Sequence, residues 1–372
     1  MESRRGQLLA VGTFPPETGR GIEAAAAAVG TTTRFIARDG LAAALEEEPL
    51  ALLLAMDGPA AATTCLEIRT QPRSAAMPIL GYSPRRGDLA FTELFCSGGD
   101  DLVEQGSGDA LIRRLRAVIT ARSAASAAPE ADRGIAVVAA NDPQWRSVMG
   151  RALNGAGYSV RFVATGAELE ALAAQAKVVV AADDLQPEGA APVARRVRAA
   201  GSESPWVVVA PPKRMVAAAR AVRSLVRVAP VDSFAPPENV LFVLNELISA
   251  RGVDQRRSPR ILYGASVAFR AAGRDEDEVG FSYNISAAGL YVRTLAPPDP
   301  EQQVWIDVWP PRSERRVRLA GRVAWRRLFG ESAKTGVPPG FGVQLTDGLA
   351  GDLGRWETGY EELRRSMMGT LI

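Results

Sequence analysis

Short apolar segments alternate with alanine-rich amphipathic segments as far as about residue 250, and this alternation constrains the fold more than any other feature. In a first run, residues 8–11 and 50–55 are apolar and residues 21–29 are amphipathic. In a second run, residues 135–138 are apolar and residues 144–156 are amphipathic. Strands that alternate with helices build a parallel sheet covered by helices on both faces. The sequence therefore predicts two successive α/β domains, each with a parallel sheet.

The alternation is interrupted once and then ends. Residues 121–133 are small and polar and show no periodicity, which is typical of a linker. Beyond residue 250, apolar segments follow one another with only proline, glycine and polar turns between them. We expect strands at residues 279–283, 289–294, 303–309, 316–325 and 340–345. The predicted domains are residues 1–120, 134–250 and 251–372, and the third is an all-β barrel.

The third domain shows the period of two that a sheet with one buried face requires. Val304, Ile306 and Val308 fall on one face of their strand, and in the next strand Val323 and Trp325 are expected to share a face. A C-terminal helix that starts near Asp347 is expected to close the barrel with an apolar stripe. The stripe consists of Leu349, Leu353, Trp356, Tyr360 and Leu363.

The composition excludes several kinds of function. The chain has no histidine and only two cysteines, Cys65 and Cys96, which excludes histidine-dependent hydrolysis, histidine phosphorelay and structural zinc for the chain by itself. Its formal net charge of +2 provides no field that steers nucleic acid. No apolar run approaches the ~20 residues of a membrane helix, and the start has no signal-peptide pattern. We therefore expect a cytoplasmic protein that is not an enzyme, holds no metal or other cofactor, and inserts in no membrane.

Two short motifs of the third domain carry side chains suited to an anionic nucleotide. They are Arg256, Arg257 and Arg260 and, later in the chain, Asn284, Ser286 and Gly289. Guanidinium groups make planar, bidentate hydrogen bonds with anions and purine edges, and glycine lets a backbone approach a ligand closely. Alone, the arginine cluster is more often a solvated hinge, and the second set is a common turn composition. Together on one barrel, the two motifs predict a nucleotide site.

Residues 256–365 resemble the PilZ domain, the bacterial receptor module for cyclic di-GMP. Arg256 and Arg260 match the two arginines of its arm, which are four positions apart. The second motif of the family, in its asparagine form Asn-x-Ser-x-x-Gly, begins at Asn284. Residues 321–325 also fit one of the closing strands of the family. The resemblance covers the whole third domain.

This resemblance implies a site for cyclic di-GMP, whose two guanines each show O6 and N7 as adjacent acceptors that an arginine fork satisfies. Arg256 and Arg260 would engage guanine edges and phosphates, with Arg257 in support. The asparagine and serine of the second motif would bond the other base, and its glycine would let the nucleotide lie close. Residues 252–259 would form an arm that the ligand orders, which would fix the angle between the barrel and the preceding domains.

The first two domains resemble receiver domains of two-component signalling, which implies a flavodoxin-like fold. Phosphoryl transfer in that family needs a carboxylate nucleophile, acids that hold Mg²⁺ and a cation near the phosphoryl oxygens. In the first domain Ala55 stands in place of the nucleophile, and Gly12 and Thr13 stand in place of the acids. Ser83 occupies the hydroxyl position, and Gln105 replaces the lysine. The first domain is therefore a degenerate receiver.

The second domain keeps more of the receiver pattern. Asp183 matches the phosphoacceptor, and Asp142 lies near the place of the acidic pair. Ala210 replaces the hydroxyl residue, and the lysine position falls on Ala235 or Ala229. Asp183 is thus a candidate phosphoacceptor in a site that lacks its other parts.

The leading hypothesis is a non-enzymatic cyclic di-GMP effector whose receiver-like domains bind protein partners or dimerise. One alternative is a scaffold that keeps the PilZ fold for protein contacts and binds no nucleotide. It is disfavoured because a protein-binding surface has no need of both motifs together. The other alternative is a response regulator controlled by phosphorylation of Asp183. As a class, the resemblance implies control of motility, exopolysaccharide output or development.

Overall fold

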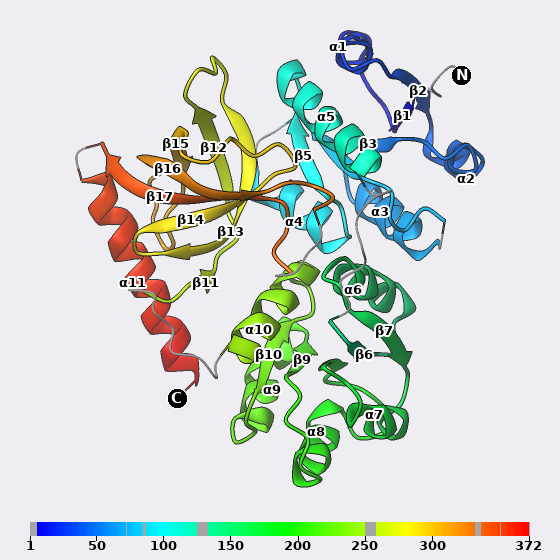
Figure 1. The fold of residues 1–372 in the computed structure, drawn as a ribbon, viewed down its shortest axis with the longest axis vertical. Helices are drawn as coiled ribbons and strands as arrows, with labels where there is room; N and C mark the ends of the chain where they lie inside the picture. Colours follow the sequence, from blue (N-terminus) through cyan, green and yellow to red (C-terminus); the bar gives the residue numbers. More distant parts are fainter. Residues whose placement is uncertain are drawn as a thin grey trace.

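A computed structural model describes residues 6–71, 73–84, 87–124, 133–249, 258–331, 336–349 and 351–371. Two parallel α/β domains precede an antiparallel barrel with a C-terminal helix, which confirms the predicted fold class. In Figure 1 the barrel (yellow to orange) lies beside the first domain (blue to cyan), and the second domain (green) lies below both. Arg256, Arg257 and most of the predicted arm lie outside the described residues.

The first domain is a parallel sheet with the strand order β2-β1-β3-β4-β5, which is the flavodoxin-like order. Its strands are β1 (Gln7–Val11), β2 (Thr32–Ile36), β3 (Ala51–Ala55), β4 (Ile79–Ser83) and β5 (Asp101–Glu104). Its helices are α1 (Pro16–Ala27), η1 (Arg38–Gly40), α2 (Leu41–Leu45), α3 (Ala60–Thr70), α4 (Asp88–Cys96) and α5 (Gly108–Ala124). Helix α5 thus continues into the residues assigned to the linker.

The strands of this sheet are apolar throughout because helices cover both faces. Leu9 and Leu52 belong to the core on one face, and their neighbours Leu8 and Leu53 belong to the core on the other. A sheet with two buried faces reads as a continuous apolar run rather than as an alternation. This is why residues 50–55 could be recognised as a strand from the sequence.

The second domain repeats this arrangement, with the order β10-β9-β8-β6-β7. Its strands are β6 (Ile135–Ala139), β7 (Ser159–Val163), β8 (Val178–Ala182), β9 (Trp206–Ala210) and β10 (Val228–Asp232). Its helices are α6 (Pro143–Gly155), α7 (Gly166–Ala173), α8 (Ala190–Ala199), η2 (Pro212–Arg214), α9 (Met215–Val222) and α10 (Pro237–Ser249). Read from the other edge, the strand order is that of the first domain.

The third domain is an antiparallel barrel. Its strands are β11 (Ile261–Leu262), β12 (Ser266–Ala271), β13 (Glu278–Ser286), β14 (Gly289–Arg293), β15 (Gln303–Val308), β16 (Val317–Arg327) and β17 (Gly340–Gly348). The ring β13-β12-β15-β16-β17-β14 closes because β14 also pairs with β13, and β11 adds to β13. Helix α11 (Asp352–Leu371) packs Trp356 and Tyr360 into the barrel core. Four members of the predicted stripe thus close the barrel, since Leu353 and Leu363 also pack against this core.

The barrel departs from the sequence prediction at several points. Strands β11 and β12 are not predicted, because a pair of residues and a short run of small and apolar residues are weak signals. A register shift after Val323 turns Trp325 to the outer face, where its ring stacks on Tyr291 with the centroids 4.9 Å apart. Strand β17 continues to Gly348, so helix α11 begins at Asp352 and not near Asp347. Leu349 therefore lies before the helix and is 61% exposed.

A buried interface joins the barrel to the first domain, which the sequence does not indicate. The Arg114 guanidinium on α5 lies 2.8 Å from the Asp101 carboxylate of its own domain and 3.0 Å from the Glu278 carboxylate of β13. All three side chains are at most 1% exposed. Beside them, the ring of Phe281 stacks on that of Phe91 with the centroids 5.3 Å apart. The first domain and the barrel therefore share a core as well as ion pairs.

The second domain joins this interface beside Phe281, which pairs with Arg293 of β14. The Arg293 guanidinium at the end of β14 donates to both carboxylate oxygens of Glu238 on α10, at 3.1 and 3.2 Å. It also lies 3.6 Å from the centre of the Phe95 ring on α4. The Tyr283 hydroxyl donates to the backbone carbonyl of Glu238 at 2.6 Å. Arg293 thus contacts both preceding domains, and we call this contact set the three-domain junction.

Candidate nucleotide-binding site

The second predicted motif lies where β13 turns into β14. In the register of these strands Asn284 pairs with Tyr291 and Ser286 pairs with Gly289. A register shift between Ser282 and Asn284 marks a bulge, which changes the direction of the following side chains. Because Ile285 belongs to the barrel core, its neighbours Asn284 and Ser286 face outward.

Asn284 has the environment of a ligand-binding group. Its side chain is 6% exposed, and its amide makes no hydrogen bond with the part of the chain that the structure describes. The Ser286 hydroxyl donates only a long hydrogen bond of 3.4 Å to the Gly289 carbonyl. A ligand that hydrogen-bonds to these groups would replace the solvent at their polar atoms. The two side chains are therefore available to a ligand on the outer face.

Arg260 lies beside this motif. Ile261 pairs with Ile285 in the register of β11 and β13, so the preceding residue, Arg260, comes next to Ser286. Ile261 is part of the core, and Arg260 therefore faces outward, as Ser286 does. The structure thus brings Arg260, Asn284, Ser286 and Gly289 to one end of the outer barrel surface.

Gly289 has a reason to be glycine that does not involve a ligand. A Cβ atom at this position would lie 2.3 Å from the backbone carbonyl oxygen of Val343 on β17. That distance is well inside van der Waals contact, so the pairing of β14 with β17 by itself requires glycine here. The sequence interpretation, in which glycine makes room for the nucleotide, is therefore not needed to explain this residue.

Helix α11 holds both halves of the site, a role that the sequence does not indicate. The Trp356 indole N–H donates to the Ser286 carbonyl at 3.1 Å. One helical turn later, the Tyr360 hydroxyl donates to the Pro259 carbonyl at 2.7 Å. The sequence predicts both aromatic residues only as core, because their polar atoms find partners only after the helix has docked.

The first domain lacks the acidic side chains of the predicted receiver site among its described residues. The end of β1 comes so close to the end of β3 that a Cβ atom on Gly12 would lie 2.8 Å from the Cβ atom of Ala55. Gln105 donates its amide to the Thr18 hydroxyl at 2.5 Å. Throughout the described ranges, no group of three or more acidic or cysteine side chains is placed to hold a metal ion. The edge that corresponds to the predicted phosphoryl site thus carries Gly12, Ala55 and Gln105, and the nearby Asp57 carboxylate is paired with Arg38 at 2.5 Å.

In the second domain Asp183 follows β8 and is paired with a cation from a neighbouring loop. The Arg214 guanidinium lies 2.8 Å from the Asp183 carboxylate. Burial raises the pKa of Asp183, and Arg214 opposes that rise. Asp142, the predicted acid nearby, accepts hydrogen bonds from the backbone N–H groups of Gln144 and Trp145 at 2.8 and 3.2 Å, so it caps α6. Asp183 therefore has a cation beside it, while Asp142 is used by its own helix.

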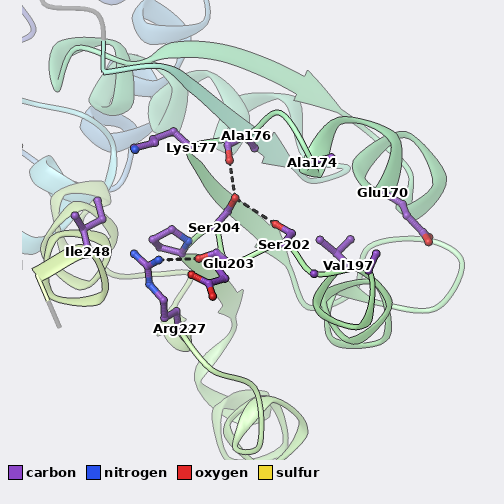
Figure 2. Close-up of a pocket in the computed structure, with 13 residues that line it drawn as sticks. Glu170, Ala174, Ala176, Lys177, Val197, Ser202, Glu203, Ser204, Arg227 and Ile248 are labelled. Carbon is purple, nitrogen blue, oxygen red and sulfur yellow. Dashed lines mark hydrogen bonds between the residues drawn. The ribbon is translucent and has the colours of Figure 1, made fainter. Parts of the chain in front are cut away.

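A cavity of about 670 Å³ lies in the second domain at the edge opposite Asp183. Figure 2 shows Lys177, Ser204 and Arg227 on its wall, each close to the amino end of a strand. The Arg227 guanidinium donates to the Glu203 carbonyl at 2.8 Å, and the Ser204 hydroxyl donates to the Ala176 carbonyl at 2.6 Å. Ligands of open α/β sheets bind outside the carboxyl ends of the strands. The cavity is therefore separate from both candidate sites.

No helix among the described residues combines the length and apolar character needed to cross a membrane. Comparison with known proteins bears on the third domain above all. Residues 254–356 match the family model of the PilZ domain. No curated protein matches the sequence.

Several solved structures are similar to parts of the chain. The inhibitor of motility from Bacillus subtilis is 18% identical, with a TM-score of 0.25, over 32% of this chain and 53% of that one. A putative response regulator from Chloroflexus aurantiacus is 20% identical, with a TM-score of 0.29, over 32% of this chain and 99% of that one. The PilZ domain of CeSA from a cellulose-synthesizing bacterium is 18% identical, with a TM-score of 0.21, over 30% of this chain and 99% of that one. The match to the PilZ family model covers residues 254–356, and two parallel α/β domains with the flavodoxin-like strand order precede them.

Proposed function

We propose that this chain is a non-enzymatic regulator that binds cyclic di-GMP on its PilZ domain. The observation that carries the proposal is the meeting of Arg260, Asn284 and Ser286 on one outer face of the barrel. In this arrangement an arginine fork, a hydroxyl and an amide without a partner converge at one end of the barrel. They lie in a segment that matches the PilZ family.

The chemistry of the ligand fits these groups. Each guanine presents O6 and N7 as adjacent acceptors, which a guanidinium satisfies with two parallel hydrogen bonds. The phosphates add negative charge that arginines of the arm neutralise, so Arg256 and Arg257 belong to the proposed site with Arg260. Asn284 offers both donors and an acceptor to the remaining base. Binding of this kind needs no metal or other cofactor.

The proposed regulation follows from the strands that carry the site. Strand β13 runs from Glu278 and Phe281, at the interface with the first domain, to Ser286 in the site. Strand β14 runs from Gly289 in the site to Arg293 in the three-domain junction. A ligand changes domain geometry only through contacts that differ between two arrangements. We place that difference at Arg293 and Glu238, and the receiver-like domains then present the change to protein partners.

Isothermal titration calorimetry of the full chain with cyclic di-GMP tests the binding proposal. We expect saturable heat with cyclic di-GMP, and weaker binding of cyclic di-AMP, because adenine carries an amino group where guanine carries the O6 acceptor. A titration without heat at any temperature tried, together with no retention in equilibrium dialysis, would rule out nucleotide binding. The scaffold alternative would then become the leading function.

Removing the two hydrogen bonds from α11 is expected to weaken nucleotide binding. Trp356→Phe and Tyr360→Phe keep aromatic packing and delete the donors to Ser286 and Pro259. Each loss corresponds to roughly 1 kcal/mol, so the affinity for cyclic di-GMP should fall about fivefold for each variant in calorimetry. Tyr263→Phe is the matched control, because its hydroxyl donates to the Trp309 carbonyl at 2.9 Å and does not touch the site. Equal affinities in all three variants would show that α11 does not position the site.

A further inference from the structure

A row of residues continues from the candidate site across the outer face of the barrel. Successive strands pair Ser286 with Gly289, Gly289 with Gln344, and Gln344 with Arg322. Each strand of the row has at least one neighbouring residue in the barrel core. These neighbours are Ile285, Leu290, Val323, Val343 and Leu345. Because side chains alternate along a strand, the whole row faces outward.

Gly289 lies in the middle of this row and has no side chain. Ser286 and Gln344 lie on either side of it, two strand spacings or roughly 10 Å apart. Nothing but backbone separates them, since Gly289 has no side chain and the carbonyl of Val343 excludes any larger residue there. No side chain therefore lies between Ser286 and Gln344, and the proposed ligand approaches across this strip of backbone from the Arg260 side.

Gln344 lies on the side of Gly289 away from Ser286, and its side chain is available to a ligand. Its side chain is exposed and makes no hydrogen bond or ion pair within the described ranges. Its neighbour Arg322 is engaged, because the guanidinium lies 2.5 Å from the Glu301 carboxylate. Of the two side chains beyond Gly289, the uncharged amide of Gln344 is therefore the one on the outer face without a competing partner among the described residues.

We infer that Gln344 is an additional specificity-determining contact to the nucleotide, an inference that rests on the proposed function. A primary amide carries two N–H donors and one carbonyl acceptor. Guanine offers O6 and N7 acceptors on one edge, to which the amide N–H groups donate. Gln344 thereby adds a contact from β17 to those from β11 and β13, and the nucleotide is bound from both sides of Gly289.

The test exchanges the donor for an acceptor. Gln344→Glu keeps the length of the side chain but replaces N–H donors with a carboxylate that accepts only and carries negative charge toward the phosphates. Calorimetry with cyclic di-GMP should show affinity reduced about tenfold or more, and Gln344→Ala should show a smaller loss. The matched control is Gln303→Glu, which places the same charge in the same row beyond Arg322. The control should bind as the unmodified chain does.

The possible outcomes distinguish the role of Gln344 from the proposal that the chain binds cyclic di-GMP. If the unmodified chain produces no heat, the nucleotide proposal fails and the role of Gln344 fails with it. If the unmodified chain binds but Gln344→Glu binds as tightly as Gln303→Glu does, only the role of Gln344 is overturned. Equal weakening by both substitutions would also overturn it, because a general charge effect would then explain the loss. Thermal unfolding of both exposed variants checks that the fold is unchanged.

Discussion

Replacing Arg260 with alanine is expected to weaken cyclic di-GMP binding about 100-fold. Arg260 is the one arginine of the predicted arm within the described residues, and the register places it beside Ser286. Removing one partner of a hydrogen-bonded charge pair costs roughly 2–5 kcal/mol, and about 2.7 kcal/mol corresponds to that factor. Part of the cost is the guanine or phosphate acceptor that is left desolvated in the complex.

Calorimetry of Arg260→Ala beside Arg318→Ala measures this loss with its control. Arg318 also projects from the outer barrel surface, is 74% exposed and lies 3.4 Å from Asp307. Arg318→Ala removes the same charge at a distance from the site. The affinity of this variant for cyclic di-GMP should therefore stay within about a factor of two of that of the unmodified chain. Arg260→Lys should fall between the two, because an ammonium cannot form the planar fork. Similar affinities for Arg260→Ala and Arg318→Ala would contradict the assignment of the arm.

Replacing Arg114 with methionine is expected to cost roughly 3–5 kcal/mol of the free energy of unfolding. Arg114 lies between the buried carboxylates of Asp101 and Glu278, and it donates a further hydrogen bond to the Val279 carbonyl at 2.7 Å. Methionine fills a similar volume but leaves two buried negative charges without their cation. The substitution should destabilise both the first domain and its interface with the barrel, because Arg114 pairs with an acid in each.

The measurement is chemical denaturation followed by tryptophan fluorescence, with Arg116→Met as the control. Arg116 lies on the same helix and is exposed, so its substitution should change the free energy of unfolding by less than about 0.5 kcal/mol. Burial raises the pKa of Asp101, although Arg114 opposes the rise. When the pKa of an acid is raised in the folded state, protonation at lower pH stabilises that state. The loss in the free energy of unfolding caused by Arg114→Met should therefore become smaller toward acidic pH. A deficit equal to that of Arg116→Met would show that the buried ion pairs do not hold the interface.

The parts of the fold that could be predicted are those that a local sequence pattern indicates. Continuous apolar runs such as residues 50–55 signal strands covered on both faces, and the alternation of Val304 and Ile306 with exposed neighbours signals a barrel wall. The bulge that turns Trp325 outward could not be read, because a register shift depends on the partner strand. The start of α11 was placed too early for a similar reason, since the end of β17 is set by its pairing with β16.

The candidate site divides in the same way. Its two motifs are short and contiguous, so Arg260, Asn284 and Ser286 could be named before the fold was known. Gln344 could not be named, because only the pairing of β14 with β17 brings it beside Gly289. The interface between the barrel and the first domain could not be predicted from the sequence either. Arg114 lies on an amphipathic helix and Glu278 follows an acidic run, and such residues are usually solvated surface charges until packing brings them together.

Hydrogen exchange of the full chain, measured by mass spectrometry with and without cyclic di-GMP, tests the central claim most directly. We predict slower exchange on binding in peptides that cover residues 256–262 and 284–290, where the arm and the second motif lie. A further change is expected around Arg293 and the start of α10, where the site strands meet the second domain. Helix α1, far from both, should be unaffected. Unchanged exchange in both site segments at saturating cyclic di-GMP would contradict the account.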